Sequence, residues 1–289
     1  MKIRFNLVIT CLLLLVLIGT VPILAQDSDT VLEITDLPDG LPDAFDAFEQ
    51  YVNVFGVHVV ADERVDADKV LHAAGVLAQY LDNDQDGEVD NEDVLEEMLD
   101  FDATLFMFDD EDREMDEFFD QIERSFDPED IAMQPLFGFE THPEGSRDEG
   151  RFDATLEEVL HLITYAGYSQ AYPDVWGEEP DTEVANAMDI ARGGFFERVP
   201  NRYPDDAWYT YYDRTCDYPC QITEYIYWSL TSLLGAQDFP GRLDEIGEEW
   251  RLNTPELVES QDPAMYALLT DPIYAFPTIL PDGNYEVED

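Results

Sequence analysis

The spacing of apolar residues follows two different periods along the chain. Residues 51–60 form a β-branched and aromatic run, which is typical of a buried strand. From residue 67 to 81 the apolar positions recur every three or four residues, which predicts an amphipathic helix. Residues 103–108 then predict a second strand, residues 112–126 another amphipathic helix, and residues 137–139 a short edge strand.

The second half of the chain has helical spacing. Helices are expected over residues 153–166, 181–192, 221–235 and 241–250, with a short one near 263–270. Strands therefore come early and helices late, and this order predicts an α+β fold with a small early strand layer and a mainly helical second half. No repeat or low-complexity linker divides residues 46–289, so we expect one α+β domain there, after an acidic lead-in over residues 26–45.

The first 25 residues have a different composition. Lys2 and Arg4 precede an apolar run that is short for a membrane span, and Ala25 precedes a polar stretch. This pattern predicts a secretory signal over residues 1–25, and hence a secreted or extracytoplasmic protein with no membrane span after cleavage. Ile23 is larger than the usual residue three positions before the cut, so an uncleaved N-terminal anchor is the alternative.

Charge and hydrophobic content together exclude two classes of protein. The 289 residues include 67 Asp or Glu but only 14 Lys or Arg, which gives a formal net charge of −53. Because 45% of the residues are hydrophobic, the chain has enough apolar material for a core, so it is not a disordered acidic tail. It lacks the basic footprint that nucleic-acid binding needs. Repulsion among these negative charges indicates that the folded protein depends on salt or bound cations. Either a salt-adapted source or calcium binding would explain the acidic composition.

Two cysteines remain once the signal is removed, Cys216 and Cys220. In an oxidising compartment this spacing predicts a small disulfide-closed turn, and Pro219 favours a turn over a helix there. The alternative is a metal site, which would need two further soft ligands nearby.

Residues 82–93 carry oxygen ligands at alternating positions. Asp82, Asp84 and Asp86 occupy positions one, three and five, and Gly87 stands where the backbone must turn sharply. The segment resembles an EF-hand calcium loop between two helices, and the resemblance implies calcium bound by six residues, namely Asp82, Asp84, Asp86, Glu88 through its carbonyl, Asp90 through water, and Asp93. Position twelve holds Asp93 where that family usually has Glu. Because EF-hand sensors work in pairs and one loop occurs here, we expect a structural role.

The predicted helix over residues 153–166 has one apolar side and one polar side. Asp153 is a good N-cap and Gly167 a natural stop. At about 100° per residue, Glu157, Glu158 and His161 fall on one face together with Tyr165, opposite the apolar arc.

This helix resembles the active-site helix of zincin metallopeptidases, His-Glu-x-x-His, with Glu157 in place of the first His. The resemblance implies Glu157 and His161 as ligands of zinc or another divalent transition metal, Glu158 as general base, a zincin-like arrangement and a peptide or protein substrate. Carboxylate is an accepted zinc ligand, but replacing imidazole weakens the metal as a Lewis acid.

The third ligand must come from elsewhere in the chain. Glu224 is the first choice, because it opens a strongly apolar helix in which a carboxylate would otherwise be costly to bury. Asp189 is the second choice and His142 the third. A tyrosine could donate a hydrogen bond to a developing oxyanion, the candidates being Tyr209, Tyr211 and Tyr212.

Two functions follow from these motifs. The first is an exported calcium-binding protein that carries a zincin-like metal-dependent hydrolase site. The alternative is a non-catalytic, calcium-stabilised binding or scaffold protein in which the polar helix face is solvated. A di-iron carboxylate site is excluded, because Glu158-x-x-His161 has no second copy. His58 and His72 are expected to be packing residues.

Overall fold

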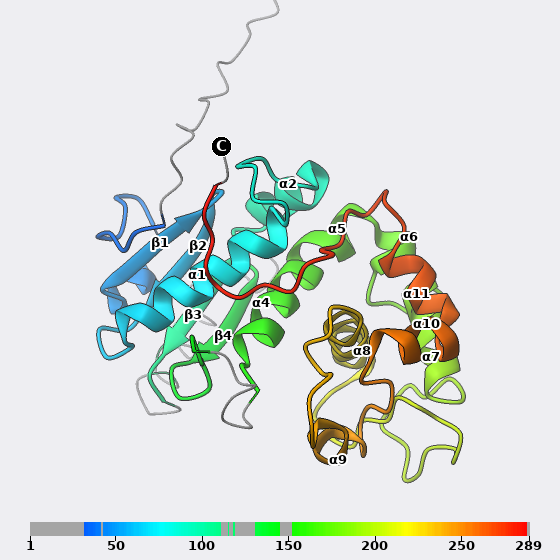
Figure 1. The fold of residues 1–289 in the computed structure, drawn as a ribbon. Coiled ribbons are helices and arrows are strands. Elements are labelled where there is room, and N and C mark those ends of the chain that lie inside the picture. Colours follow the sequence, from blue (N-terminus) through cyan, green and yellow to red (C-terminus); the bar gives the residue numbers. More distant parts are fainter. Residues whose placement is uncertain are drawn as a thin grey trace, which may run out of the picture.

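The computed structural model describes residues 32–41, 43–110, 115, 118, 131–144 and 152–287. It confirms the α+β class: the sheet is built from the first half of the chain and the second half is helical (Figure 1). The signal segment and nearly all of the helix expected over residues 112–126 lie outside the described residues. Within the described residues, no helix has the length and apolar character needed to cross a membrane.

Four strands form one mixed sheet in the order β1-β2-β3-β4. β1 (Gln50–Val54) is antiparallel to β2 (Val57–Ala61), while β3 (Thr104–Phe108) is parallel both to β2 and to β4 (Met133–Phe137). β4 therefore forms one edge of this sheet.

The single strand expected over residues 51–60 is wrong, because the segment is a hairpin. Phe55 and Gly56 both have positive φ, 53° and 100°, and form the turn between β1 and β2. Asn53 Oδ1 accepts a hydrogen bond from Gly56 N at 3.0 Å. A glycine inside a strand pattern was the available signal. β4 also begins earlier than the expected 137–139, and it contains Pro135, which an edge strand tolerates.

The sheet is apolar on both faces. Along β3, Leu105 and Met107 join the main core, whereas Phe106 and Phe108 join a separate aromatic core. The 3₁₀ helix η1 (Asp43–Ala47) brings Phe45 into that second core. The end of the acidic lead-in is therefore packed against the sheet.

The main core is covered by helices from both halves of the chain. α1 (Ala67–Leu81) has the predicted bounds and packs on β1 and on α4 (Thr155–Ile163). α2 (Glu92–Asp100) follows the loop over residues 82–93.

The expected stop at Gly167 is wrong. α4 continues into the π-helix η2 (Thr164–Tyr168) and α5 (Ser169–Ala171), and α6 (Pro173–Trp176) follows after a break at Tyr172. A Cβ atom on Gly167 would lie 2.6 Å from Val94 Cγ1 of α2, so this glycine permits close helix packing.

The remaining helices form the second half of the molecule (Figure 1). Their bounds are α7 (Glu183–Ala191), α8 (Tyr218–Leu233), α9 (Arg242–Ile246), α10 (Pro255–Gln261) and α11 (Pro263–Leu269). α10 was not expected, although Thr254 as N-cap and Pro255 in the first turn are its start signals.

The disulfide between Cys216 and Cys220 is present, with a Cα–Cα distance of 5.3 Å. It does not close a separate turn, because α8 already begins at Tyr218. Pro219 stands in the first helical turn, where its missing N–H is tolerated, and the Asp217 side chain caps Cys220 N at 3.2 Å. The disulfide therefore anchors the beginning of α8.

Residues 277–287, here called the C-terminal strap, run along α1 (red in Figure 1). Gln79 Oε1 accepts hydrogen bonds from Asp282 N and Gly283 N, at 2.9 and 2.8 Å. A Cβ atom on Gly75 would lie 2.1 Å from Gly283 O, so the strap approaches the helix backbone directly. The last described residues are thus part of the fold.

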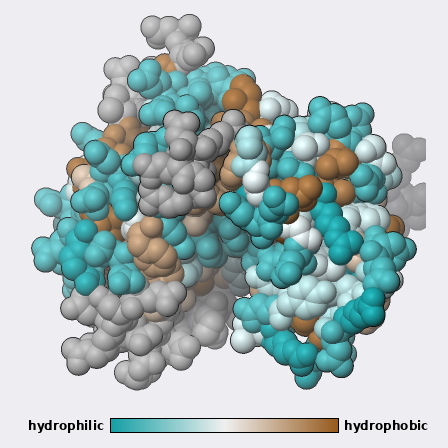
Figure 2. Space-filling view, turned by 60° about the horizontal axis from the view of Figure 1, so that its bottom comes forward, coloured by the Kyte–Doolittle hydropathy of each residue, from teal (hydrophilic) through white to brown (hydrophobic). Residues whose placement is uncertain are grey.

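The surface reflects the composition. On the face shown in Figure 2, hydrophilic side chains dominate, hydrophobic residues form scattered patches, and a hollow separates two parts of the molecule.

Candidate metal centres

Glu157 and His161 lie one turn apart on α4, and Glu224 faces them from α8. One ligand atom from each of these residues lies within 4.8 Å of the other two, and His161 Nε2 is 3.9 Å from Glu224 Oε2. The distances fit three ligands of one ion, because metal–ligand bonds of about 2 Å bring such atoms close together. We call this group the Glu–His–Glu centre.

The other third-ligand candidates lie elsewhere. Asp189 forms an ion pair with Arg192 at 2.6 Å and accepts a hydrogen bond from Tyr218. His142 is not part of the centre, and its backbone N–H donates to Asp153.

The imidazole of His161 is held from one side. Its Nδ1 lies 3.6 Å from Glu158 Oε2, and the Glu158 carboxylate accepts a hydrogen bond from Gln134 Nε2 of β4. His161 is only 9% exposed, and among the described residues its Nε2 has no hydrogen-bond partner. A buried nitrogen without a partner costs about 1–3 kcal/mol, which a bound ion would offset. The polar face of α4 is therefore covered, with Glu157 and Glu158 half-buried.

Burial raises the pKa values of the two glutamates in this centre, and the neighbouring carboxylates raise that of His161. Burial and the neighbouring Glu224 raise the pKa of Glu157 to about 8. Burial also raises the pKa of Glu224. Burial alone would lower the pKa of His161, but the contact of its ring with Glu158 and the charges of Glu224, Glu158 and Glu157 outweigh it and raise the pKa to about 9. Without a metal ion the centre binds protons, which a divalent ion would displace.

A pocket of about 310 Å³ opens beside the centre. Its lining residues come from β4, α4, η2, α8 and the loop between α6 and α7, and they are Gln134, His161, Tyr165, Glu178, Cys220, Thr223 and Glu224. Glu158 is not among them. The pocket thus gives a ligand access to His161 and Glu224.

Sequence reasoning missed three polar residues of this pocket, Gln134, Glu178 and Thr223. Gln134 is a polar residue within an apolar strand, which is a weak signal, and Glu178 lies in a loop that carried none. Of the three tyrosine candidates, Tyr211 lies nearest the centre, donating its hydroxyl to Glu224 Oε1 at 3.2 Å. Tyr209 is buried and donates to the Gln221 carbonyl instead.

Two aromatic residues expected near the centre lie at the surface. Tyr212 is exposed. Tyr165 borders the pocket, but it is also exposed and packs on Phe101 with ring centroids 5.6 Å apart.

A second carboxylate group lies in the loop over residues 82–93, here called the calcium loop. Ligand oxygens of Asp82, Asp84 and Asp86 lie within 4.8 Å of one another. Asp82 is buried and the other two are exposed. Gly87 has a φ of 87°, and its N–H donates to Asp82 Oδ2 at 2.9 Å. The loop therefore turns where the EF-hand resemblance requires it.

The expected ligands at the later loop positions are not grouped with these three aspartates. Asp90 Oδ2 accepts a hydrogen bond from Asn83 N at 2.8 Å, and Glu88 N donates to Asp86 Oδ1 at 2.8 Å. Asp93 is exposed in the first turn of α2 and is not part of the three-aspartate group. Ligation by Glu88, Asp90 and Asp93 stays a prediction.

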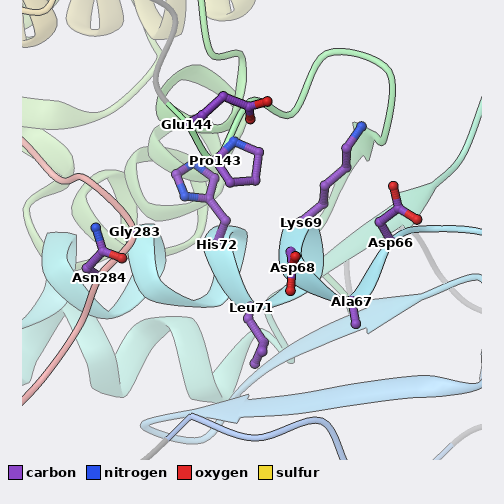
Figure 3. Close-up of a pocket in the computed structure, with 10 residues that line it drawn as sticks. All are labelled: Asp66, Ala67, Asp68, Lys69, Leu71, His72, Pro143, Glu144, Gly283 and Asn284. Carbon is purple, nitrogen blue, oxygen red and sulfur yellow. The ribbon is translucent and has the colours of Figure 1, made fainter.

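A larger pocket of about 860 Å³ lies along the first turns of α1. Figure 3 shows Lys69 and His72 projecting from this helix on the side of Pro143 and Glu144. His72 Nε2 is 2.7 Å from Asp153 Oδ2, and both side chains are buried. Asp153 therefore pairs with His72 directly before α4. Its Oδ1 also accepts a hydrogen bond from Thr155 N at 3.3 Å, although the residue at the N-cap position is Ala154.

His58, the other histidine expected to pack, is half-buried and has its Nδ1 3.0 Å from the Tyr51 hydroxyl. It belongs to neither carboxylate group.

Similarity assigns neither centre. No protein-family model, curated protein or solved structure matches this chain. Function is therefore argued from geometry and chemistry.

Proposed function

We propose that the protein is an exported, metal-dependent peptide hydrolase whose ion is held by Glu157, His161 and Glu224. The observation that carries this proposal is the convergence of these three side chains around a buried His161 Nε2 that has no hydrogen-bond partner among the described residues. A divalent ion bound there would polarise a carbonyl group and lower the pKa of a water molecule. The adjoining pocket supplies room for a substrate.

The surrounding residues support this role for His161. A metal-binding histidine usually pairs its second nitrogen with a carboxylate, which orients the ring. Glu158, held by Gln134, stands in that place. We therefore assign Glu158 a positioning role; its action as general base, which the zincin resemblance implies, stays a prediction.

The ligand set bears on the choice of metal. Two carboxylates and one imidazole are harder ligands than the paired imidazoles of zincins, and imidazole–carboxylate sets accept zinc as well as iron or manganese. Metal identity is therefore a measurement to make alongside occupancy.

The test is elemental analysis of the dialysed mature protein, followed by hydrolysis assays on a peptide mixture. Wild type should retain one transition-metal ion per chain, and His161→Ala should lose it together with peptide hydrolysis. Asp82→Ala is the matched control, since it should keep the transition metal. A wild type that retains calcium alone and cleaves no peptide would leave the non-catalytic, calcium-stabilised protein as the better explanation.

Calcium binding is the second proposed function, favoured by the grouping of Asp82, Asp84 and Asp86 around a loop with the required turn. Calcium prefers such oxygen ligands. Bound there, it would fix α1 relative to α2 and would offset part of the charge repulsion of the chain.

A further inference from the structure

The pocket beside the Glu–His–Glu centre has an acidic wall with no lysine or arginine among its lining residues. One of the lining carboxylates, Glu178, does not belong to the metal-binding set. It lies in the loop between α6 and α7, lines the same pocket as His161 and is hydrogen-bonded to Thr223 of α8.

The position of Glu178 is well defined. Thr223 Oγ1 donates a hydrogen bond to Glu178 Oε1 at 3.0 Å. The loop that carries Glu178 is closed by Thr182, whose hydroxyl donates to the Gly177 carbonyl at 2.9 Å. A Cβ atom on Gly177 would lie 2.3 Å from the Pro173 carbonyl oxygen, so the backbone is tightly packed just before Glu178. A rigid loop presents this carboxylate to the pocket.

No lysine or arginine in the described part of the chain pairs with Glu178. Burial raises the pKa of this half-buried carboxylate, and the charges of Asp217 and Glu179 add to the rise, while the Thr223 hydrogen bond and the charge of His161 act against it. A half-buried carboxylate with one hydroxyl partner is costly unless a cation joins it.

Metal binding would not remove this excess. A divalent ion balances the two carboxylate ligands, Glu157 and Glu224, and Glu158 faces His161. Glu178 is then the remaining negative group on the pocket wall. An anionic ligand would be repelled there, whereas an ammonium or guanidinium group would form a charge-assisted hydrogen bond in a half-buried setting.

From this charge balance we infer that the pocket selects a peptide with lysine or arginine next to the scissile bond, and that Glu178 binds its cationic group. The inference rests on the proposed hydrolase function. About 310 Å³ lies at the lower end of small-ligand sites, which suits one long side chain better than an extended ligand. The His161 side of the pocket would then hold the peptide carbonyl.

The experiment compares three peptides that differ at one position, with arginine, glutamine or glutamate beside the cleaved bond. The metal-loaded protein should cleave the arginine peptide with the highest kcat/KM and the glutamate peptide with the lowest. In Glu178→Gln the arginine-over-glutamine ratio should fall at least about 10-fold, mainly through KM, because one charge-assisted contact is lost. Glu179→Gln, an exposed neighbour with the same change, should keep the wild-type ratio.

A binding measurement separates this inference from the proposed function. Calorimetry with arginine amide and citrulline amide, which differ in charge, should show tighter binding of arginine amide to wild type and no such preference in Glu178→Gln. If no peptide is cleaved but this preference is found, the hydrolase proposal fails and the cation site stands. Cleavage without a preference for arginine overturns the cation site and leaves the hydrolase. If neither cleavage nor a preference for arginine is found, both the hydrolase proposal and the cation site are overturned, provided that thermal melts show each variant folded.

Discussion

The two carboxylate centres of this molecule are built in opposite ways. The calcium loop takes Asp82, Asp84 and Asp86 from five consecutive residues, two of them exposed. The Glu–His–Glu centre joins α4 to α8, distant in sequence, around a buried imidazole. A local centre depends on backbone turns within one loop, whereas a distributed centre depends on helix packing.

The difference also appears in how like charges are tolerated. Water can screen the exposed loop carboxylates. In the buried centre the groups bind protons, with the pKa of Glu157 at about 8. Variants that disturb one centre and spare the other can therefore test how independent the two are.

The largest effect is expected where the two regions are connected, at the buried pair of His72 on α1 and Asp153 before α4. Asp153→Asn should lower the free energy of unfolding by about 3 kcal/mol, because it leaves a buried histidine without its charged partner. Urea denaturation at neutral pH measures the loss. Asp68→Asn, which removes an exposed charge from the same end of α1, should change stability by less than about 0.5 kcal/mol.

This pair also has a defined pH dependence. Burial alone would raise the pKa of Asp153, but hydrogen bonding and charge from His72, with help from His142 and Thr155, lower it below its ordinary value of 3.8. Because the folded pKa is the lower one, the stabilisation is present above the unfolded pKa and is lost as the pH falls through the folded value. The stability gap between wild type and Asp153→Asn should therefore narrow below about pH 4. A stability difference between wild type and Asp153→Asn that does not change on acidification would contradict the interaction between His72 and Asp153.

The calcium loop should make stability depend on free calcium. At a concentration 100 times the Kd, wild type should gain about 2.7 kcal/mol over its value in chelator. Asp82→Asn should abolish that gain, while Asp100→Asn, an exposed change at the end of α2, should retain it. Denaturation with and without calcium gives both numbers. An equal gain in wild type and Asp82→Asn would place the calcium elsewhere.

Gly167 lies where the helix after α4 crosses α2, so it bears on both regions. Gly167→Ala should lower stability by about 2 kcal/mol, because the added methyl group overlaps Val94 and approaches Met98. Gly138→Ala is the matched control, since its added atom meets neighbours only at 3.4 Å or more. Thermal melts measure both variants, and equal effects would show that helix packing does not depend on this glycine.

The smallest effect is expected at Gln134, which holds the Glu158 carboxylate beside the His161 imidazole. Gln134→Ala removes the donor that holds Glu158 and should weaken transition-metal binding about 10-fold, as is usual for residues that support a ligand. Calcium-dependent stability should not change. Competition with a fluorescent chelator gives the affinity, and Gln170→Ala, at an exposed glutamine, is the control. Unchanged affinity in Gln134→Ala would mean that Glu158 does not position His161.

The sequence identified the residues of the two centres to different extents. Three aspartates at alternating positions before Gly87 are a local signal. Glu157 and His161 share a helix face, and Glu224 was identifiable because a carboxylate in an apolar helix needs a partner. Gln134 and Glu178 reach the pocket only through strand order and loop closure, which no local pattern encodes.

Two other features show the same limit for the fold. A glycine after a helix-forming segment ends some helices and permits close packing in others, so Gly167 could not be assigned without knowing that α2 lies against it. Asp153 has the sequence context of a helix cap, and its Oδ1 accepts a hydrogen bond from Thr155 N, but its Oδ2 binds His72, which is far away in the chain and could not be found from the local pattern.

The C-terminal strap has a consequence for the order of folding. Gln79 on α1 donates to the Asn284 carbonyl, a contact that closes a loop of 205 residues. Closing such a long loop carries an entropic cost, and contacts of this kind slow folding. During synthesis, α1 leaves the ribosome well before the strap exists, so the side of this helix around Gly75 and Gln79 stays open until residues 282–284 have been made. If the proposed export takes place, this delay lengthens the time in which the chain remains open enough to be translocated.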